Sequence, residues 1–154
     1  MRKLMTIALL VAAHAWLTAD PVAFESVINF EGSIRTLSEH VRSGRDDLID
    51  TERYFILEGV VASTQVFDPD PASFLALIEL VSSNWVGVER IEVHRVYVLV
   101  QGPEYVDRLP ERLPRDPQPH IITTSQRLLV IGPFIGTETL EDGEVAVVLA
   151  VKMR

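Results

Sequence analysis

The sequence predicts an all-β protein with five strands. Five stretches rich in β-branched and aromatic residues follow one another from residue 54 to the end of the chain. Segments containing proline, glycine and aspartate separate them, as expected for connecting loops. The chain has 154 residues, of which 47% are hydrophobic, and no cysteine. One core without disulfide bonds or thiolate chemistry is therefore expected.

The first residues are typical of an export signal. Two basic residues precede an apolar run over residues 4–17, and Ala13-His14-Ala15 has the small-x-small pattern of a cleavage site. We expect a signal peptide over 1–15, with cleavage after Ala19 as the alternative. The run is too short to span a bilayer comfortably, so we expect no transmembrane helix after its removal. The predicted location is periplasmic or extracellular.

Residues 16–52 are expected to form a partly helical N-terminal extension. Ser33 is a candidate N-cap for a helix over 33–41, whose apolar residues recur at helical spacing, and Gly44 would end it. The stretch 22–30 fits a helix or a strand. The main domain is then predicted to cover 53–154.

Each strand of that domain has its own boundary signals. The five strands are expected at 54–65, 74–81, 91–100, 126–135 and 144–153. Asp68-Pro69-Asp70-Pro71 predicts a loop after the first strand. In the third strand the apolar residues change phase, which we interpret as a β-bulge near His94 and Arg95.

The connection between the third and fourth strands combines two kinds of segment. Gly102 ends the third strand, and Pro103 suits the first turn of a short helix over 103–109. Four prolines then predict an irregular arm over 110–119. The last two strands are expected to be joined by an acidic hairpin over 137–143 that contains Asp142-Gly143.

Five strands with a helix between the third and fourth have the order of the OB fold, and the resemblance covers 54–153. It depends on Phe55–Val61 opening the barrel, on Gly102-Pro103 leading into the helix, and on Leu128–Gly132 before the acidic hairpin. The pattern resembles exported bacterial OB-fold proteins of uncharacterised role. The resemblance implies a small Greek-key barrel.

The sequence contains no motif of a catalytic or metal site. The histidines that follow the signal, His40, His94 and His120, are far apart and no cysteine accompanies them. No Gly-x-Ser-x-Gly elbow and no phosphate-binding glycine loop is present. We therefore predict a protein that is not an enzyme and has no cofactor or metal. A periplasmic hydrolase remains as an alternative, with Ser82 and Glu89 as candidate residues.

The charge of the chain disfavours polyanionic partners. The net charge is −8, and Lys152 is the only lysine after Lys3. An acidic protein repels nucleic acid, which we therefore regard as an unlikely partner. A single-stranded nucleic-acid-binding OB protein remains an alternative, and its affinity would fall steeply with salt.

One stretch combines exposed aromatic residues with arginines. OB folds stack bases or sugar rings on aromatic side chains over the second and third strands. The predicted ligand-binding residues are Trp85, Arg90, His94, Arg95 and Tyr97. We expect a binding or scaffolding module of the cell envelope, with an envelope protein or a glycan as its partner and the 137–143 hairpin beside the site.

Overall fold

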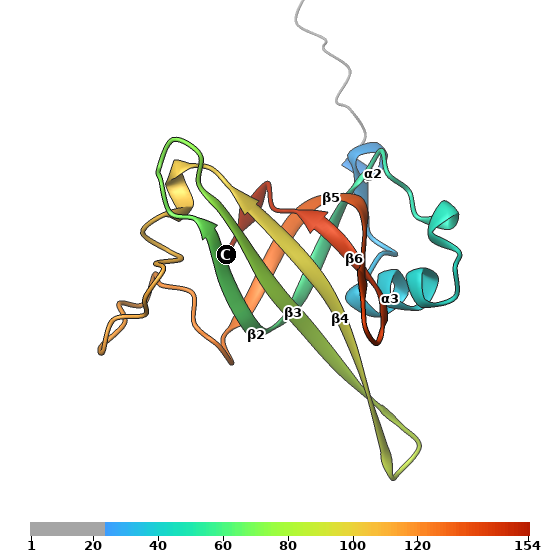
Figure 1. Cartoon of the computed structure of the whole chain (residues 1–154). Helices are drawn as coiled ribbons and strands as arrows, with labels where there is room; N and C mark the ends of the chain where they lie inside the picture. Colours follow the sequence, from blue (N-terminus) through green and yellow to red (C-terminus); the bar gives the residue numbers. More distant parts are fainter. Residues whose placement is uncertain (1–23) are drawn as a thin grey trace, which may run out of the picture.

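Five long strands form the body of the molecule (Figure 1). They are β2 (Tyr54–Asp68), β3 (Leu75–Val86), β4 (Arg90–Gln101), β5 (Arg127–Leu140) and β6 (Gly143–Leu149). This computed structural model describes residues 24–154. The predicted signal peptide and both of its cleavage sites lie outside these residues.

The pairing of the strands closes a barrel. β2 runs antiparallel to β3 on one side and to β5 on the other, and β3 runs antiparallel to β4. β6 connects the remaining edges, because it pairs in parallel with β4 and antiparallel with β5. The circuit β2–β3–β4–β6–β5–β2 is that of an OB barrel, which confirms the predicted fold. Two short strands extend it: β1 (Ile28–Asn29) beside β2 and β7 (Lys152–Met153) beside β5.

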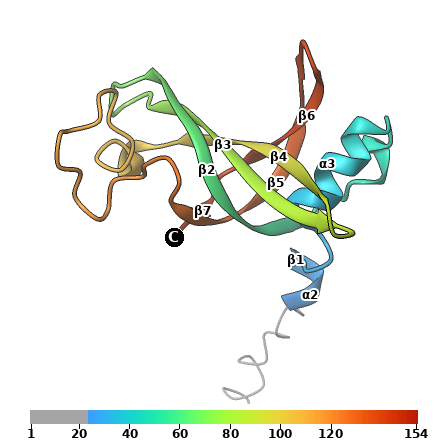
Figure 2. The same ribbon diagram turned by 90° about the horizontal axis from the view of Figure 1, so that it is seen from below.

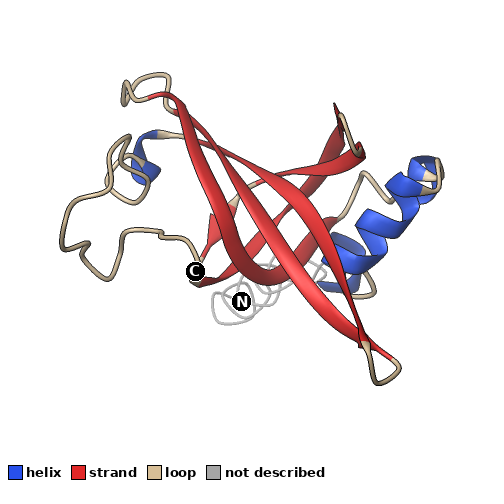
Figure 3. Cartoon of the chain, turned by 60° about the horizontal axis from the view of Figure 1, so that its bottom comes forward, coloured by secondary structure: helices blue, strands red, loops and turns tan. Residues whose placement is uncertain are grey.

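The inward faces of the five strands make the core. Alternate residues of each strand are buried, as the period of a half-buried strand requires. Fully buried examples are Leu57, Ile78, Leu80, Val96, Val98, Leu128 and Val130. Figures 1 and 3 show helix α3 (Ile34–Arg42) at one end of the barrel and the long β4–β5 connection at the other.

The N-terminal extension contributes to this same core. It contains α2 (Phe24–Val27), α3 and the 3-10 helix η1 (Asp46–Leu48). α3 begins where predicted, because the Ser33 hydroxyl accepts a hydrogen bond from the Thr36 amide at 3.1 Å. Its Ile34, Leu37 and Val41 are buried. The domain boundary at residue 52 stays a prediction.

The connection between β4 and β5 is mostly irregular (Figure 2). The predicted helix is a short 3-10 helix, η2 (Pro103–Tyr105). Tyr105 and Leu109 are buried, and the Ile122 amide donates a hydrogen bond to the Arg108 carbonyl at 2.8 Å. These contacts fix both ends of the proline-containing arm, whose residues 111–120 are exposed.

The β3–β4 hairpin extends far beyond the barrel, as Figure 3 shows. β2 pairs with β3 only as far as Val81, and β6 pairs with β4 only from Val96. Within the described residues, 82–95 therefore form a two-stranded ribbon without a third strand. The predicted bulge is wrong, because the β3–β4 register is unbroken over twelve residue pairs. The apolar residues change phase because Ile91 and Val93 lie on the outer face, where they are about half exposed.

Candidate ligand-binding face

One surface of the β3–β4 hairpin carries the candidate site. Alternation along both strands places the odd-numbered residues on the outer side of the barrel. We call this surface the hairpin face; it comprises Leu75, Leu77, Glu79, Val81, Ser83, Trp85, Ile91, Val93, Arg95, Tyr97, Leu99 and Gln101. At about 3.3 Å per residue it is about 40 Å long.

The outer end of the hairpin face is an exposed apolar patch. Trp85 is 69% exposed and lies directly across from Ile91 in the register. Val93 extends the patch toward the barrel, and Val88 in the turn is 92% exposed. Contiguous exposed apolar side chains, and a tryptophan in particular, indicate an interaction site.

The middle of the hairpin face combines an aromatic ring with an ion-pair network. Tyr97 is partly exposed and lies across from Glu79. Arg95 donates hydrogen bonds from Nη2 to both carboxylate oxygens of Asp142 at 2.5 Å, and its Nη1 lies 3.9 Å from a Glu79 oxygen. The hydrogen bond from Arg95 lowers the pKa of Asp142 below its usual value. The acidic β5–β6 hairpin therefore flanks the site, and the charge of Arg95 is already balanced.

His94 does not belong to this face. It is 3% exposed and points inward, on the same side of β4 as Val96. Its electrostatic interaction with Glu39 places it next to α3. Both ring nitrogens lack a hydrogen-bond partner among the described residues. A buried side chain cannot contact a ligand on the surface, so we remove His94 from the candidate site.

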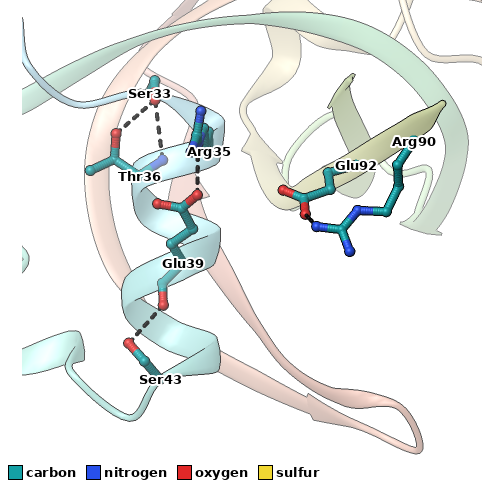
Figure 4. A network of polar contacts seen from close by, with 7 residues as sticks. All are labelled: Ser33, Arg35, Thr36, Glu39, Ser43, Arg90 and Glu92. Carbon is teal, nitrogen blue, oxygen red and sulfur yellow. Dashed lines mark hydrogen bonds and ion pairs between the residues drawn. The ribbon is translucent and has the colours of Figure 1, made fainter. Parts of the chain in front are cut away.

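Arg90 also lies on the opposite side of the ribbon. Its Nη2 atom is 2.5 Å from an oxygen of Glu92, on the same strand face. Figure 4 shows this pair beside α3, where Arg35 and Glu39 form a second ion pair at 2.6 Å. Of the five predicted residues, the structure thus brings Trp85, Arg95 and Tyr97 onto one face.

A groove at the base of the ribbon was missed by the sequence analysis. It has a volume of about 470 Å³ and is lined by Glu58, Gly59, Val60, Val81, Ser82, Ser83, Val93 and Arg127. Gly59 permits β3 and α3 to approach β2 here, because a Cβ atom would lie 2.7 Å from both the Val81 carbonyl oxygen and Ile34 Cδ1. The sequence signal that could have predicted this groove is the glycine within the pattern of a strand, which often marks a close approach of backbones.

Charged side chains form one edge of the groove. Arg127 Nη1 lies 3.4 Å from Glu58 Oε1, and both side chains are mostly exposed. Ser82 is on the groove wall, whereas Glu89 lies in the turn at the far end of the ribbon, so the two hydrolase candidates are not brought together. Among residues 24–154, no group of three or more acidic or histidine side chains is placed to hold a metal ion.

Comparisons with known proteins give matches only among solved structures. No protein-family model matches the sequence, and no curated protein matches it. A Plasmodium falciparum SSB in complex with ssDNA is similar with 11% identity and a TM-score of 0.44, covering 66% of this chain and 89% of that one. A small single-stranded DNA-binding protein from Streptomyces coelicolor has 13% identity and a TM-score of 0.40, with the same coverage.

These matches bear on the predictions for function, partner and location. Both matched proteins are single-stranded DNA-binding proteins, and neither match supports the predicted envelope module, its envelope or glycan partner or its exported location. The expectation that nucleic acid is an unlikely partner is not supported by the matches either. Both matched proteins are described by DNA binding, and neither description names an enzymatic activity. In the described part of the chain, no helix is long and apolar enough to cross a membrane.

Proposed function

We propose that this chain is a non-catalytic OB-fold module that binds single-stranded nucleic acid on the hairpin face. The observation that carries the proposal is the exposure of Trp85, at 69%, on an apolar ribbon that continues to Tyr97. Unpaired bases stack on such side chains, and each stacked base contributes about 1–3 kcal/mol. The hairpin face is long enough to hold several nucleotides in a row.

An acidic protein can bind single-stranded nucleic acid if stacking, and not charge, supplies most of the affinity. The chain has a net charge of −8, and the arginine at the centre of the face is held by Asp142 and Glu79. Few positive charges are therefore free to neutralise phosphates. Base stacking on aromatic and apolar side chains supplies most of the affinity, and binding is correspondingly modest.

The test is the affinity of the full chain for a fluorescently labelled thymidine oligonucleotide, measured by anisotropy. Trp85→Ala is expected to weaken binding about tenfold, since the loss of one stacking platform costs about 1–3 kcal/mol. Tyr97→Ala should have a smaller effect because Tyr97 is less exposed.

Phe67→Ala is the matched control, because Phe67 is an aromatic residue that is 52% exposed on β2, outside the hairpin face. It should bind like the unmodified chain. Circular dichroism of each variant checks that the barrel is intact. Equal affinities for the Trp85 and Phe67 variants, or no binding by the unmodified chain, would overturn the proposal.

A further inference from the structure

We propose that the groove beside Gly59 is a nucleobase subsite that prefers guanine. This inference rests on the proposed function and adds a base preference to it. The groove adjoins the hairpin face, because Val81, Ser83 and Val93 belong to both. A nucleic-acid strand whose base stacks on Trp85 reaches the groove at Ser83. This residue is two positions nearer the barrel along β3, a distance of about 7 Å.

The floor of the groove suits the flat side of a base. Val60 lies across from Val81 between β2 and β3, and Val93 lies across from Ser83 between β3 and β4. Val60 and Val93 are 36% and 53% exposed, so their methyl groups are open to a ligand. A planar ring placed on these side chains covers apolar surface that water now contacts.

The edge of the groove supplies complementary hydrogen-bonding groups. The Glu58 carboxylate only accepts hydrogen bonds and the Arg127 guanidinium only donates them. Their charged atoms lie 3.4 Å apart, so an acceptor and a donor stand side by side. Both side chains are mostly exposed and can turn toward a bound base. Ser82 and Ser83 add hydroxyl groups that serve either role.

Guanine matches this edge better than the other bases. It presents two adjacent N–H donors, at N1 and N2, to the two oxygens of Glu58, and its O6 acceptor lies next to them for Arg127. Arginine is a common partner of guanine O6. Adenine and cytosine offer a single amino group at the corresponding edge. In thymine and uracil the single N–H lies between two carbonyl oxygens, which a carboxylate repels.

The experiment compares short thymidine strands that differ only in one central base. The full chain is expected to bind the strand with a central guanine about tenfold more tightly than the all-thymidine strand, as for a bidentate base contact. Adenine and cytosine should fall between them. A single guanine in a thymidine strand keeps the probe unstructured.

Glu58→Gln is expected to remove most of this difference, because a carboxamide offers only one acceptor oxygen. Glu52→Gln removes the same charge at an exposed position outside the groove and should keep the guanine preference. Arg127→Gln provides a second variant on the other half of the edge and should also reduce the preference.

The possible outcomes distinguish the guanine preference from the proposed binding of single-stranded nucleic acid. Equal affinity of the unmodified chain for all four strands, or an unchanged guanine preference in Glu58→Gln, overturns the base preference and leaves the proposed function in place. Absence of binding to every strand overturns both.

Discussion

Gly132 lies where β5 passes directly beside the carbonyl group of Leu149. A Cβ atom at this position would lie 1.7 Å from the Leu149 oxygen, which is far inside contact distance. The clash is with backbone, which cannot turn away as a flexible side chain could. We expect Gly132→Ala to lower the free energy of unfolding by about 3 kcal/mol, measured by urea denaturation. A loss below about 0.5 kcal/mol would mean that the strands separate easily at this point.

The Arg95–Asp142 pair gives a second prediction for single residues. Because the hydrogen bond from Arg95 lowers the pKa of Asp142 below that of a free aspartate, the pair contributes stability at pH values above the ordinary aspartate pKa. This contribution disappears as the pH falls through the pKa of the folded protein. NMR titration of the Asp142 carboxyl should show that its pKa rises toward the usual value of an aspartate in Arg95→Gln. An identical midpoint in both proteins would show that Arg95 does not hold the acidic hairpin in solution.

Among the described elements, helix α3 begins at a side-chain cap. The Ser33 hydroxyl accepts the Thr36 amide at 3.1 Å and thereby satisfies an amide that has no partner within the helix. Ser33→Ala should lower the stability of the protein by about 1 kcal/mol in thermal unfolding. Ser33→Asp is the matched control, because aspartate caps helices equally well. If both variants unfold like the original protein, the cap contributes nothing.

The same element shows what local sequence signals can predict. Ser33, Gly44 and the spacing of Ile34, Leu37 and Val41 are sufficient to predict α3 almost to the residue. The signal works because capping and side-chain periodicity are properties of neighbouring residues. The partner of α3 is not such a property, and its place at the end of the barrel followed only from the structure.

The β3–β4 hairpin shows where a local signal was misinterpreted. A phase change in an apolar pattern has two explanations: an inserted residue, or a change in which face is exposed. We inferred a bulge, which allowed His94 and Arg95 to be assigned to one site. The register is unbroken, so alternation places them on opposite faces. Trp85, Arg95 and Tyr97 were predictable together because all are odd-numbered positions of one straight ribbon.

At the scale of the whole molecule, closure of the barrel forms the groove, which the sequence could not predict. Glu58 and Arg127 are far apart in the chain, and only the β2–β5 pairing brings their strands together at Val60 and Arg127. The groove depends on this closure and on the close approach of β3 to β2 at Gly59. The OB resemblance predicted the order of the strands but not which outward side chains would meet.

The charge of the whole molecule sets the last prediction. For single strands, the logarithm of the binding constant falls with the logarithm of salt concentration by about 0.7 for each phosphate neutralised. Since Arg95 is held by Asp142 and Arg90 lies on the opposite side of the ribbon, Arg127 in the adjoining groove is the exposed arginine placed to contact a phosphate. We therefore expect a slope of about −0.7, measured by anisotropy over a salt series.

This slope is much shallower than the steep dependence expected for a nucleic-acid binder from sequence alone. Arg127→Gln should flatten it by a further 0.7 or so, because one phosphate contact is lost. A slope steeper than about −3 would show that phosphate contacts dominate. In that case the Arg95–Asp142 pair must open on binding and release its guanidinium to the ligand, because the single contact from Arg127 does not account for so steep a slope.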